Sequence, residues 1–358
     1  MAMSIIDRYI IGKLLKGWLL VLAIMMAVAG ILVSVEELER VHEQYSAIDA
    51  LRFIALTMPH RTLDLAPVIT LLGTLIALLS LARHNELIAI RAAGVSPVRV
   101  LRAAVLPVCL LIISLGLIAE YVSAPLYQQA ELARGTMRSG STDLLNGKGL
   151  WSSRGRRFIS IRELHPEDEL LGVDLYEFDA NRTLILAIHA SRAKFNEDDT
   201  WKLFDVSHKE LVDGRLVDSY WKSQDMDAWL PRDELSLLSL SYVSMPLSVL
   251  YRYIQYLTAV DQPTDRFKLL FWQKISNPFA AGAMVFLGIP IGAGSGTQRG
   301  GSLGLRIATG ALAGIIFYLA TQIIYAVGLL LELDAFIIVL IPIVIILAAS
   351  AFLLLRMR

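Results

Sequence analysis

The chain has 358 residues, of which 55% are hydrophobic and 18% are charged, and its mean hydropathy is +0.57. Soluble domains carry about 25% charged residues, so the composition excludes an ordinary soluble protein and indicates an integral membrane protein. The 33 basic and 33 acidic residues give a formal net charge of zero, which excludes nothing by itself. The positions of the charges are therefore more informative than their sum.

Apolar runs along the chain approach the roughly 20 residues that a helix needs to cross a bilayer. They lie at residues 17–35, 65–81, 98–122, 269–291, 303–327 and 336–355. The first run is too long for a signal-peptide core and no cleavage site follows it, so we expect it to be retained. The single cysteine, Cys109, lies within the third run, which excludes an intrachain disulfide and favours a packing role. The runs predict six transmembrane helices.

Basic residues gather at one set of connections between these runs, as the positive-inside rule requires of cytoplasmic segments. They are Arg8, Lys13, Lys16, Arg83, Arg91, Arg99, Arg102, Arg299, Arg306, Arg356 and Arg358. The opposite connections are rich in acidic residues, namely Glu36, Glu37, Glu39, Glu43, Glu332 and Asp334. This asymmetry predicts that both termini face the cytoplasm and that residues 123–268 lie on the far side.

The long segment 123–268 has the pattern of a β domain. Strand-like runs lie at residues 158–162, 173–178, 183–190, 201–206 and 215–221. Turn signals separate them, at Asn146-Gly147, Gly172, Asn181, residues 196–199 and Asp213-Gly214. Short strands at this spacing favour a sandwich or jelly roll, and residues 247–258 predict an amphipathic helix that returns to the membrane. We therefore expect transmembrane helices in residues 1–122 and 269–358, with an all-β domain inserted at 123–268.

The sequence lacks the common local signatures of enzyme active sites. It has no phosphate-binding G-x-x-x-x-G-K-[ST] loop, no G-x-S-x-G elbow, no H-E-x-x-H helix and no paired cysteines. The six histidines show no metal-ligand spacing. We expect a chain that is not an enzyme, that binds no cofactor or metal and that does not hydrolyse ATP itself.

A polar patch follows the first apolar run. Glu36, Glu39, Arg40 and Glu43 fall at helical spacing on one side. One interpretation is an interfacial helix end with compensating charges; the other is the mouth of a membrane cavity that meets a charged lipid headgroup. In the second case the lipid-binding residues are Glu36, Arg40, Arg61, Arg134 and Arg138, because arginine binds phosphate through two parallel hydrogen bonds.

Ionisable residues within the apolar runs are scarce. His60, Arg61 and Asp64 precede the second run and Glu120 closes the third, so each can reach the membrane surface. The scarcity argues against a secondary transporter, whose midplane site usually needs buried charges. Gly310 and Gly314 form a G-x-x-x-G pair that permits close approach of another helix, and packing within the chain explains it as well as a partner does.

The cytoplasmic connection at residues 83–96 is charged and helix-prone. Its apolar residues Leu87, Ile88 and Ile90 form a face that suits burial against another protein, while Glu86 suits an ion pair across the interface. An amphipathic helix on the lipid surface explains the same pattern. The residues alone leave both interpretations open.

Three motifs carry a resemblance to a known family. Residues 85–96, NELIAIRAAGVS, resemble the coupling helix of the permease subunits of the bacterial lipopolysaccharide exporter. Residues 5–15, IIDRYIIGKLL, and residues 147–163, GKGLWSSRGRRFISIRE, resemble motifs of the LptG branch. The layout of three spans, a β domain and three spans matches over essentially the whole chain. The sequence thus resembles the LptF/LptG permease family.

The resemblance implies a permease subunit of an ABC-type exporter in the bacterial inner membrane, with the β domain as a periplasmic jelly roll. Such a subunit pairs with the permease LptF, contacts LptC and binds a dimer of the ATPase LptB, which holds the ATP. The complex extracts lipopolysaccharide and passes it to a periplasmic bridge. The ATPase-coupling residues implied are Glu86, Leu87, Ile90, Arg91 and Gly94. The first and fifth spans would form lateral gates, and no nucleic acid is expected as a partner.

The family's first span carries several lysines at its outer end, whereas this chain has Val33, Glu39 and Arg40 there. Only Arg40 keeps the basic character. The alternatives to the LptG assignment are the sister permease LptF, a membrane-anchored periplasmic scaffold, and a secondary transporter that works without nucleotide.

Overall fold

A computed structural model describes residues 5–39, 41, 45–92, 97–139, 149–165, 169–196, 198, 200–212, 215–230, 235, 242–260, 262–293 and 303–356. The chain forms two compact units. The helical unit comprises Met1–Val35, Thr57–Ser123 and Asp265–Arg358, and the sheet unit comprises Glu36–Leu56 and Ala124–Thr264. These bounds assign residues 36–56 to the sheet unit, because the chain between the first two spans packs with the segment that follows the third.

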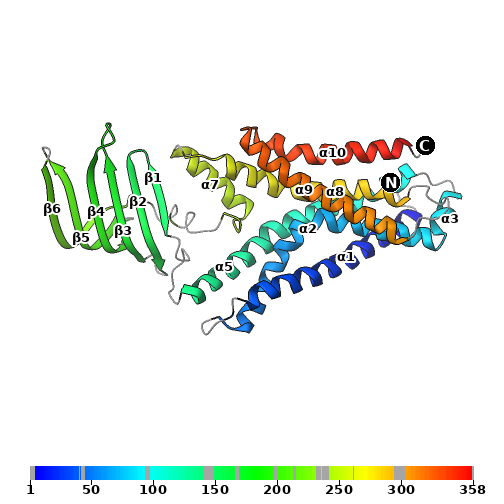
Figure 1. Cartoon of the computed structure of the whole chain (residues 1–358), viewed down its shortest axis with the longest axis horizontal. Helices are drawn as coiled ribbons and strands as arrows, with labels where there is room; N and C mark the ends of the chain where they lie inside the picture. The colour runs from blue at the N-terminus through cyan, green and yellow to red at the C-terminus, as the bar shows by residue number, and fades with distance from the viewer. Residues whose placement is uncertain are drawn as a thin grey trace. The chain divides into compact units, whose positions relative to one another are not determined.

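Within the described residues, six helices are long and apolar enough to cross a membrane. The long helices are α1 (Ile5–Leu38), α2 (Ala47–Arg83), α4 (Pro97–Ile118), α8 (Asp265–Ala293), α9 (Leu303–Leu330) and α10 (Ala335–Arg356). A π-helical turn, η1 (Ala119–Ser123), continues α4 into α5 (Ala124–Ser139). Each predicted apolar run lies in one of these segments, which confirms the six candidate spans (Figure 1).

The helices extend beyond the apolar runs that predicted them. α2 begins at Ala47, well before the run at residues 65–81, and α5 occupies the start of the segment expected to be β. Residues 124–139 are rich in good helix formers but too polar to register as a span. Hydropathy marks the part of a helix that lies in lipid, and it does not mark where the helix ends.

Small residues permit close helix packing in the helical unit. A Cβ atom at Gly17 of α1 would collide with the backbone oxygen of Gly73 of α2, so the two backbones approach closely there. The indole Nε1 of Trp18 donates a hydrogen bond to Thr74 Oγ1 at 3.0 Å beside this contact. Gly310 of α9 lies against the side chain of Leu75 on α2, which gives the small-residue pair a packing role within this chain.

The described strands form one antiparallel six-stranded sheet in chain order. They are β1 (Leu150–Arg154), β2 (Arg157–His165), β3 (Glu169–Phe178), β4 (Leu184–Phe195), β5 (Thr200–Val212) and β6 (Arg215–Asp227). Each strand-like run of the sequence coincides with one of β2 to β6, and the run at residues 183–190 begins one residue before β4, whereas β1 was not anticipated. The meander is visible in Figure 1. An antiparallel β domain is confirmed, and the two-sheet packing of a jelly roll remains a prediction.

One face of the sheet forms the core of its unit. Alternating residues of β2, β3 and β5 are fully buried, among them Ile161, Val173, Leu175 and Leu203, and Trp201 packs edge-on against Phe195. This period-two burial explains why the sequence pattern located the strands. After β6, α7 (Leu247–Ala259) coincides with the amphipathic helix expected at residues 247–258.

One expected turn is wrong. Gly172 lies inside β3, with φ of 60°, where a Cβ atom would come within 3.0 Å of Arg162 Cβ. The residue is a glycine because the strand is locally irregular and close to β2, and not because the chain reverses there. The signals at Asn181 and residues 196–199 do fall between strands, whereas Gly147 and Asp213 lie outside the described residues.

Candidate functional site

The short helix α3 (Glu86–Ala92) stands between α2 and α4, where the sequence predicted a cytoplasmic helix. Asn85 adopts φ of 56° and separates α3 from the end of α2. Asparagine tolerates this left-handed conformation better than most residues. Glu86 is the first residue of α3, where a carboxylate interacts favourably with the helix dipole.

Glu86 is bound by two residues of α1. The hydroxyl of Tyr9 donates a hydrogen bond to Glu86 Oε2 at 2.6 Å, and Lys13 Nζ lies 3.5 Å from the same oxygen. Lys13 also lies over the Tyr9 ring, 5.1 Å from its centroid. Residues four apart share one face of a helix, so α1 presents Tyr9 and Lys13 together. The Tyr9 hydrogen bond, followed by the charge of Lys13, lowers the pKa of Glu86 below its ordinary value.

Apolar packing accompanies this polar contact. Ile90 of α3 is partly buried against a cluster that contains Ile10 and Leu14 of α1. An ion pair of 3.8 Å between Arg99 of α4 and Asp7 of α1 adds a further link. The first turns of α1 are therefore joined to α3 and to the beginning of α4.

Not all of the expected coupling residues have described side chains. Leu87 and Arg91 lie in α3, but the structure describes only their backbone, and Gly94 lies outside the described residues. The sequence missed Tyr9 and Lys13 because nothing in a linear pattern shows that they come together with Glu86, which lies 77 positions from Tyr9.

A second carboxylate is bound near the other end of α1. Glu37 is 2% exposed, and its Oε1 lies 3.3 Å from Arg134 of α5. Tyr45 donates a hydrogen bond to Glu37 Oε2 at 3.1 Å, and the Arg134 guanidinium stacks over Phe53 at 4.7 Å. Burial and the bond to Glu37 raise the pKa of Tyr45 to about 12. We call Glu37, Arg134 and Tyr45 the carboxylate clamp.

The predicted lipid-binding residues do not form one cluster among the described residues. Glu36 is exposed on α1, beside but not within the carboxylate clamp. Arg61 of α2 is half-buried, and its Nε has no hydrogen-bond partner among the described residues. Arg138 lies in α5, where its side chain is not described, and Arg40 lies outside the described residues. Among the predicted arginines with described side chains, Arg134 binds an anionic group, and that group is the carboxylate of Glu37.

Glu37 and Tyr45 were missed by the sequence reasoning, although a signal for Glu37 exists. Val33 lies one helical turn before Glu37, and both side chains are 2% exposed. Glu37 therefore continues the buried face of α1. The helical spacing of Glu36, Glu39 and Glu43 instead predicted a polar patch on another side of the helix.

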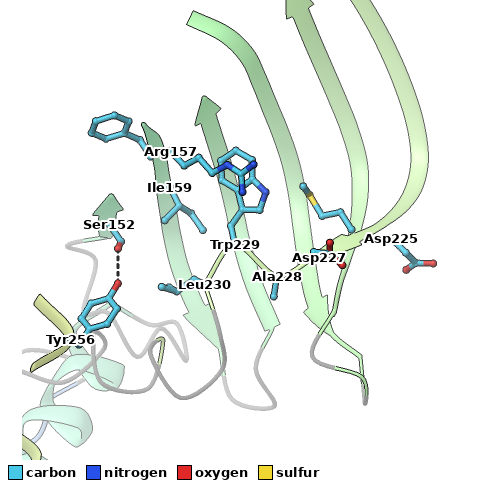
Figure 2. A pocket seen from close by; sticks show the side chains of 11 residues that line it. Ser152, Arg157, Ile159, Asp225, Asp227, Ala228, Trp229, Leu230 and Tyr256 are labelled. Carbon is cyan, nitrogen blue, oxygen red and sulfur yellow. Dashed lines mark hydrogen bonds between the residues drawn. The ribbon is translucent and has the colours of Figure 1, made fainter. Parts of the chain in front are cut away.

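The sheet unit contains an open cavity of about 540 Å³ (Figure 2). Its lining combines apolar side chains such as Ile159 and Leu230 with polar ones. Arg157 stacks over the Trp229 ring at 5.2 Å and pairs with Glu177 at 3.2 Å. Ser152 and Tyr256 are hydrogen-bonded at 3.1 Å, which ties β1 to α7. The described residues contain no group of three or more His, Cys, Asp and Glu side chains that could hold a metal ion.

Comparison with known proteins gives one consistent result. Residues 8–356 match the family described as lipopolysaccharide export system permease LptF/LptG. The chain is 30% identical over 321 residues to the lipopolysaccharide export system permease protein LptG of Haemophilus influenzae, covering 89% of each chain. It is 28% identical over 331 residues to the protein of the same name from Escherichia coli, again covering 89% of each.

Both relatives are LptG proteins, so the similarity favours the LptG branch and not LptF. The match also spans both compact units, the helical one and the sheet. The chain therefore belongs to the lipopolysaccharide export system permease LptF/LptG family.

Proposed function

We propose that this chain is the LptG-type permease subunit of an ATP-driven complex that extracts lipopolysaccharide from the bacterial inner membrane and passes it to a periplasmic bridge. The observation that carries the proposal is the family match over residues 8–356. The candidate spans and the antiparallel sheet agree with a membrane permease that bears a β domain.

The energy for extraction must come from another subunit. Exposing acyl chains to water costs about 0.8 kcal/mol per CH₂ group, so a lipid with several chains does not leave the bilayer spontaneously. The sequence holds no phosphate-binding loop of its own. The proposed partners are the ATPase LptB as a dimer, the permease LptF as the other half of the transmembrane pore, and LptC. Helix α3 is the proposed contact with LptB, through Glu86, Leu87, Ile90 and Arg91.

The proposed orientation places both termini and α3 in the cytoplasm and the sheet unit in the periplasm. The sheet, completed as a jelly roll, would receive lipopolysaccharide from the transmembrane helices. α1 and α9 are the proposed lateral gates, and exposed apolar residues along them, such as Leu20, Ile31 and Ile316, suit a surface that faces lipid.

Arg134 is the best described candidate for a contact with a lipid phosphate. It already binds the carboxylate of Glu37, so a phosphate must replace that carboxylate or share the guanidinium with it. Arg61, with a buried Nε that has no partner among the described residues, is a second candidate.

Site-specific photocrosslinking to lipopolysaccharide tests this function. A photoreactive residue at Leu20 or Ile31 of α1, or on strands of the sheet, is introduced into the chain in a reconstituted complex with LptF, LptB and LptC. We expect crosslinks to lipopolysaccharide at α1 without ATP and at the sheet only with ATP. If no crosslink to lipopolysaccharide formed in α1 or in the sheet, the result would contradict the proposal.

A further inference from the structure

The position of α3 in the chain raises the question of how a movement of this helix reaches α1. The chain joins α3 directly to α2 and α4, whereas α1 has no covalent connection to it except through the whole of α2. Movement of α3 therefore reaches α1 through side-chain contacts or through the packing of intervening helices. The described contacts between α1 and α3 are accordingly the direct route.

These contacts converge on one oxygen of Glu86. Tyr9 and Lys13 both bind Oε2. The Glu86 side chain keeps 32% of its surface exposed. One oxygen is thus engaged with α1, and the carboxylate still faces solvent, where it can accept a hydrogen bond from a cationic side chain of a partner.

Two features make this contact suitable for transmitting movement. A hydrogen bond to a charged group is stronger than a neutral one, and a bond of 2.6 Å between a phenol and a carboxylate has the short length typical of that class. The packing of Ile90 against Ile10 and Leu14 adds a shape constraint alongside it. A displaced α3 therefore exerts force on α1 through both a polar and an apolar contact.

We propose that Tyr9 and Lys13 are coupling residues of the permease: they bind Glu86 from within the chain and carry the displacement of α3 to α1, while Glu86 engages the ATPase with its exposed side. Glu86 then belongs to two interfaces at once. This inference rests on the proposed function, because it needs an ATPase that moves α3. Tyr9 and Lys13 act through Glu86 and are therefore positioning residues.

The ratio of lipopolysaccharide released to ATP hydrolysed tests the inference in the complete reconstituted complex. Tyr9→Phe removes the hydroxyl and keeps the ring over which Lys13 lies. We expect the ATPase rate to stay within about twofold of wild type and the release per ATP to fall about threefold to tenfold, given the net strength of a typical hydrogen bond that is partly exposed to water. Tyr121→Phe is the matched control, because the Tyr121 side chain is 74% exposed on η1, and it should leave the ratio unchanged.

Lys13 gives an independent series. Lys13→Met should lower the release per ATP, and Lys13→Arg should restore it, because arginine keeps the charge that faces Glu86. In the double variant Tyr9→Phe and Glu86→Gln, the loss should not exceed that of Glu86→Gln alone. A residue needed only for folding would lower complex yield and ATPase rate together and would not show this pattern.

The outcomes separate the two proposals. Wild-type release per ATP in both Tyr9→Phe and Lys13→Met overturns the coupling role and leaves the permease function intact. Equal fractional losses of ATPase rate and lipopolysaccharide release in both variants also overturn the coupling role, because the contact is then only structural. ATP hydrolysis without any release by the wild-type complex contradicts the proposed function itself.

Discussion

At the residue scale, two carboxylates are bound in similar ways but differ in how deeply they are buried. Glu37 and Glu86 each accept a hydrogen bond from a tyrosine and pair with a cation, but Glu37 is 2% exposed whereas the Glu86 side chain keeps 32% of its surface. Breaking a buried pair by removing one partner is costly because the other charge is left in a low dielectric. An exposed pair contributes little to stability. Glu37 is accordingly suited to stabilise the fold, whereas Glu86 is suited to bind a further partner.

The carboxylate clamp yields the first prediction. Arg134→Met removes the guanidinium that pairs with the buried Glu37 carboxylate at 3.3 Å and should destabilise the protein by about 3–5 kcal/mol. The double variant Glu37→Leu and Arg134→Met removes both charges and should recover most of that loss. Thermal unfolding in detergent, followed by circular dichroism, measures both. Strictly additive losses would show that Glu37 and Arg134 do not depend on each other.

Tyr45 gives a prediction of pH dependence. Its pKa is raised from 10.0 to about 12, chiefly by burial and then by the bond to Glu37. A raised pKa means that the stabilising contribution is complete below pH 10 and is lost as the pH rises through about 12. The ultraviolet absorbance difference between wild type and Tyr45→Phe should therefore show that the phenolate of Tyr45 forms near pH 12. A transition near pH 10 in the folded protein would contradict the buried hydrogen bond.

Residue-scale sites were only partly predictable from the sequence. The role of Arg134 in binding an anion was anticipated as a type of chemistry, but its partner Glu37 was not, because pairing between α1 and α5 depends on tertiary structure. Glu86 was identified from its place in a charged connection. Its bond to Tyr9 was hidden by the long sequence separation, and amphipathic patterns say nothing of such contacts.

At the element scale, the approach of α1 to α2 depends on glycine. Gly17 faces the backbone of Gly73, whereas a Cβ added at Gly30 on the same helix would meet no described residue within 4 Å apart from the adjacent turns of α1. Glycine therefore has different consequences at two positions of α1 that lie about three and a half turns apart. This contrast offers a matched pair of substitutions within one helix.

Gly17→Ala should separate α1 from α2 and destabilise the protein by about 1–3 kcal/mol through overpacking. Gly30→Ala meets no neighbour and should be neutral or stabilising by up to about 1 kcal/mol, since alanine is the better helix former. The apparent melting temperature of each variant in detergent is the measurement. Equal effects of the two substitutions would argue against the close backbone contact.

Element types were predictable where one physical property dominates. Long apolar runs located the spans, and period-two burial located β2 to β6, because lipid and a one-sided core impose those patterns. β1 was missed because LWSSR has no alternation to register, and α5 because it is helical without being apolar. The ends of helices outside the lipid depend on packing against other elements, which no hydropathy pattern contains.

At the scale of the whole molecule, the distribution of charge predicts the side of the membrane that each connection faces. In a Cys109→Ser background, Glu332→Cys should react with an impermeant maleimide in cells with a permeabilised outer membrane. Ala89→Cys, on the exposed part of α3, should react only after the inner membrane is opened. Quantified labelling on gels checks this. The reverse pattern would invert the proposed topology and remove α3 from the reach of a cytoplasmic ATPase.

The family match covers residues 8–356, but the layout of spans and sheet was already predicted from the apolar runs and the strand patterns of the sequence. The order of the strands within the sheet was less predictable from the sequence. A meander in chain order follows from short turns between neighbouring strands, whereas a closed jelly roll needs crossovers that the turn signals do not encode.

The close contact at Gly17 also divides α1 into two unequal arms. At 1.5 Å per residue, Tyr9 lies about 12 Å from Gly17 along the helix, and Val33 lies about 24 Å from it in the other direction. If α1 tilts as a rigid rod about the Gly17–Gly73 contact, a small displacement of Tyr9 would move Val33 about twice as far. A modest displacement of the shorter arm would therefore suffice to shift the opposite end of this span.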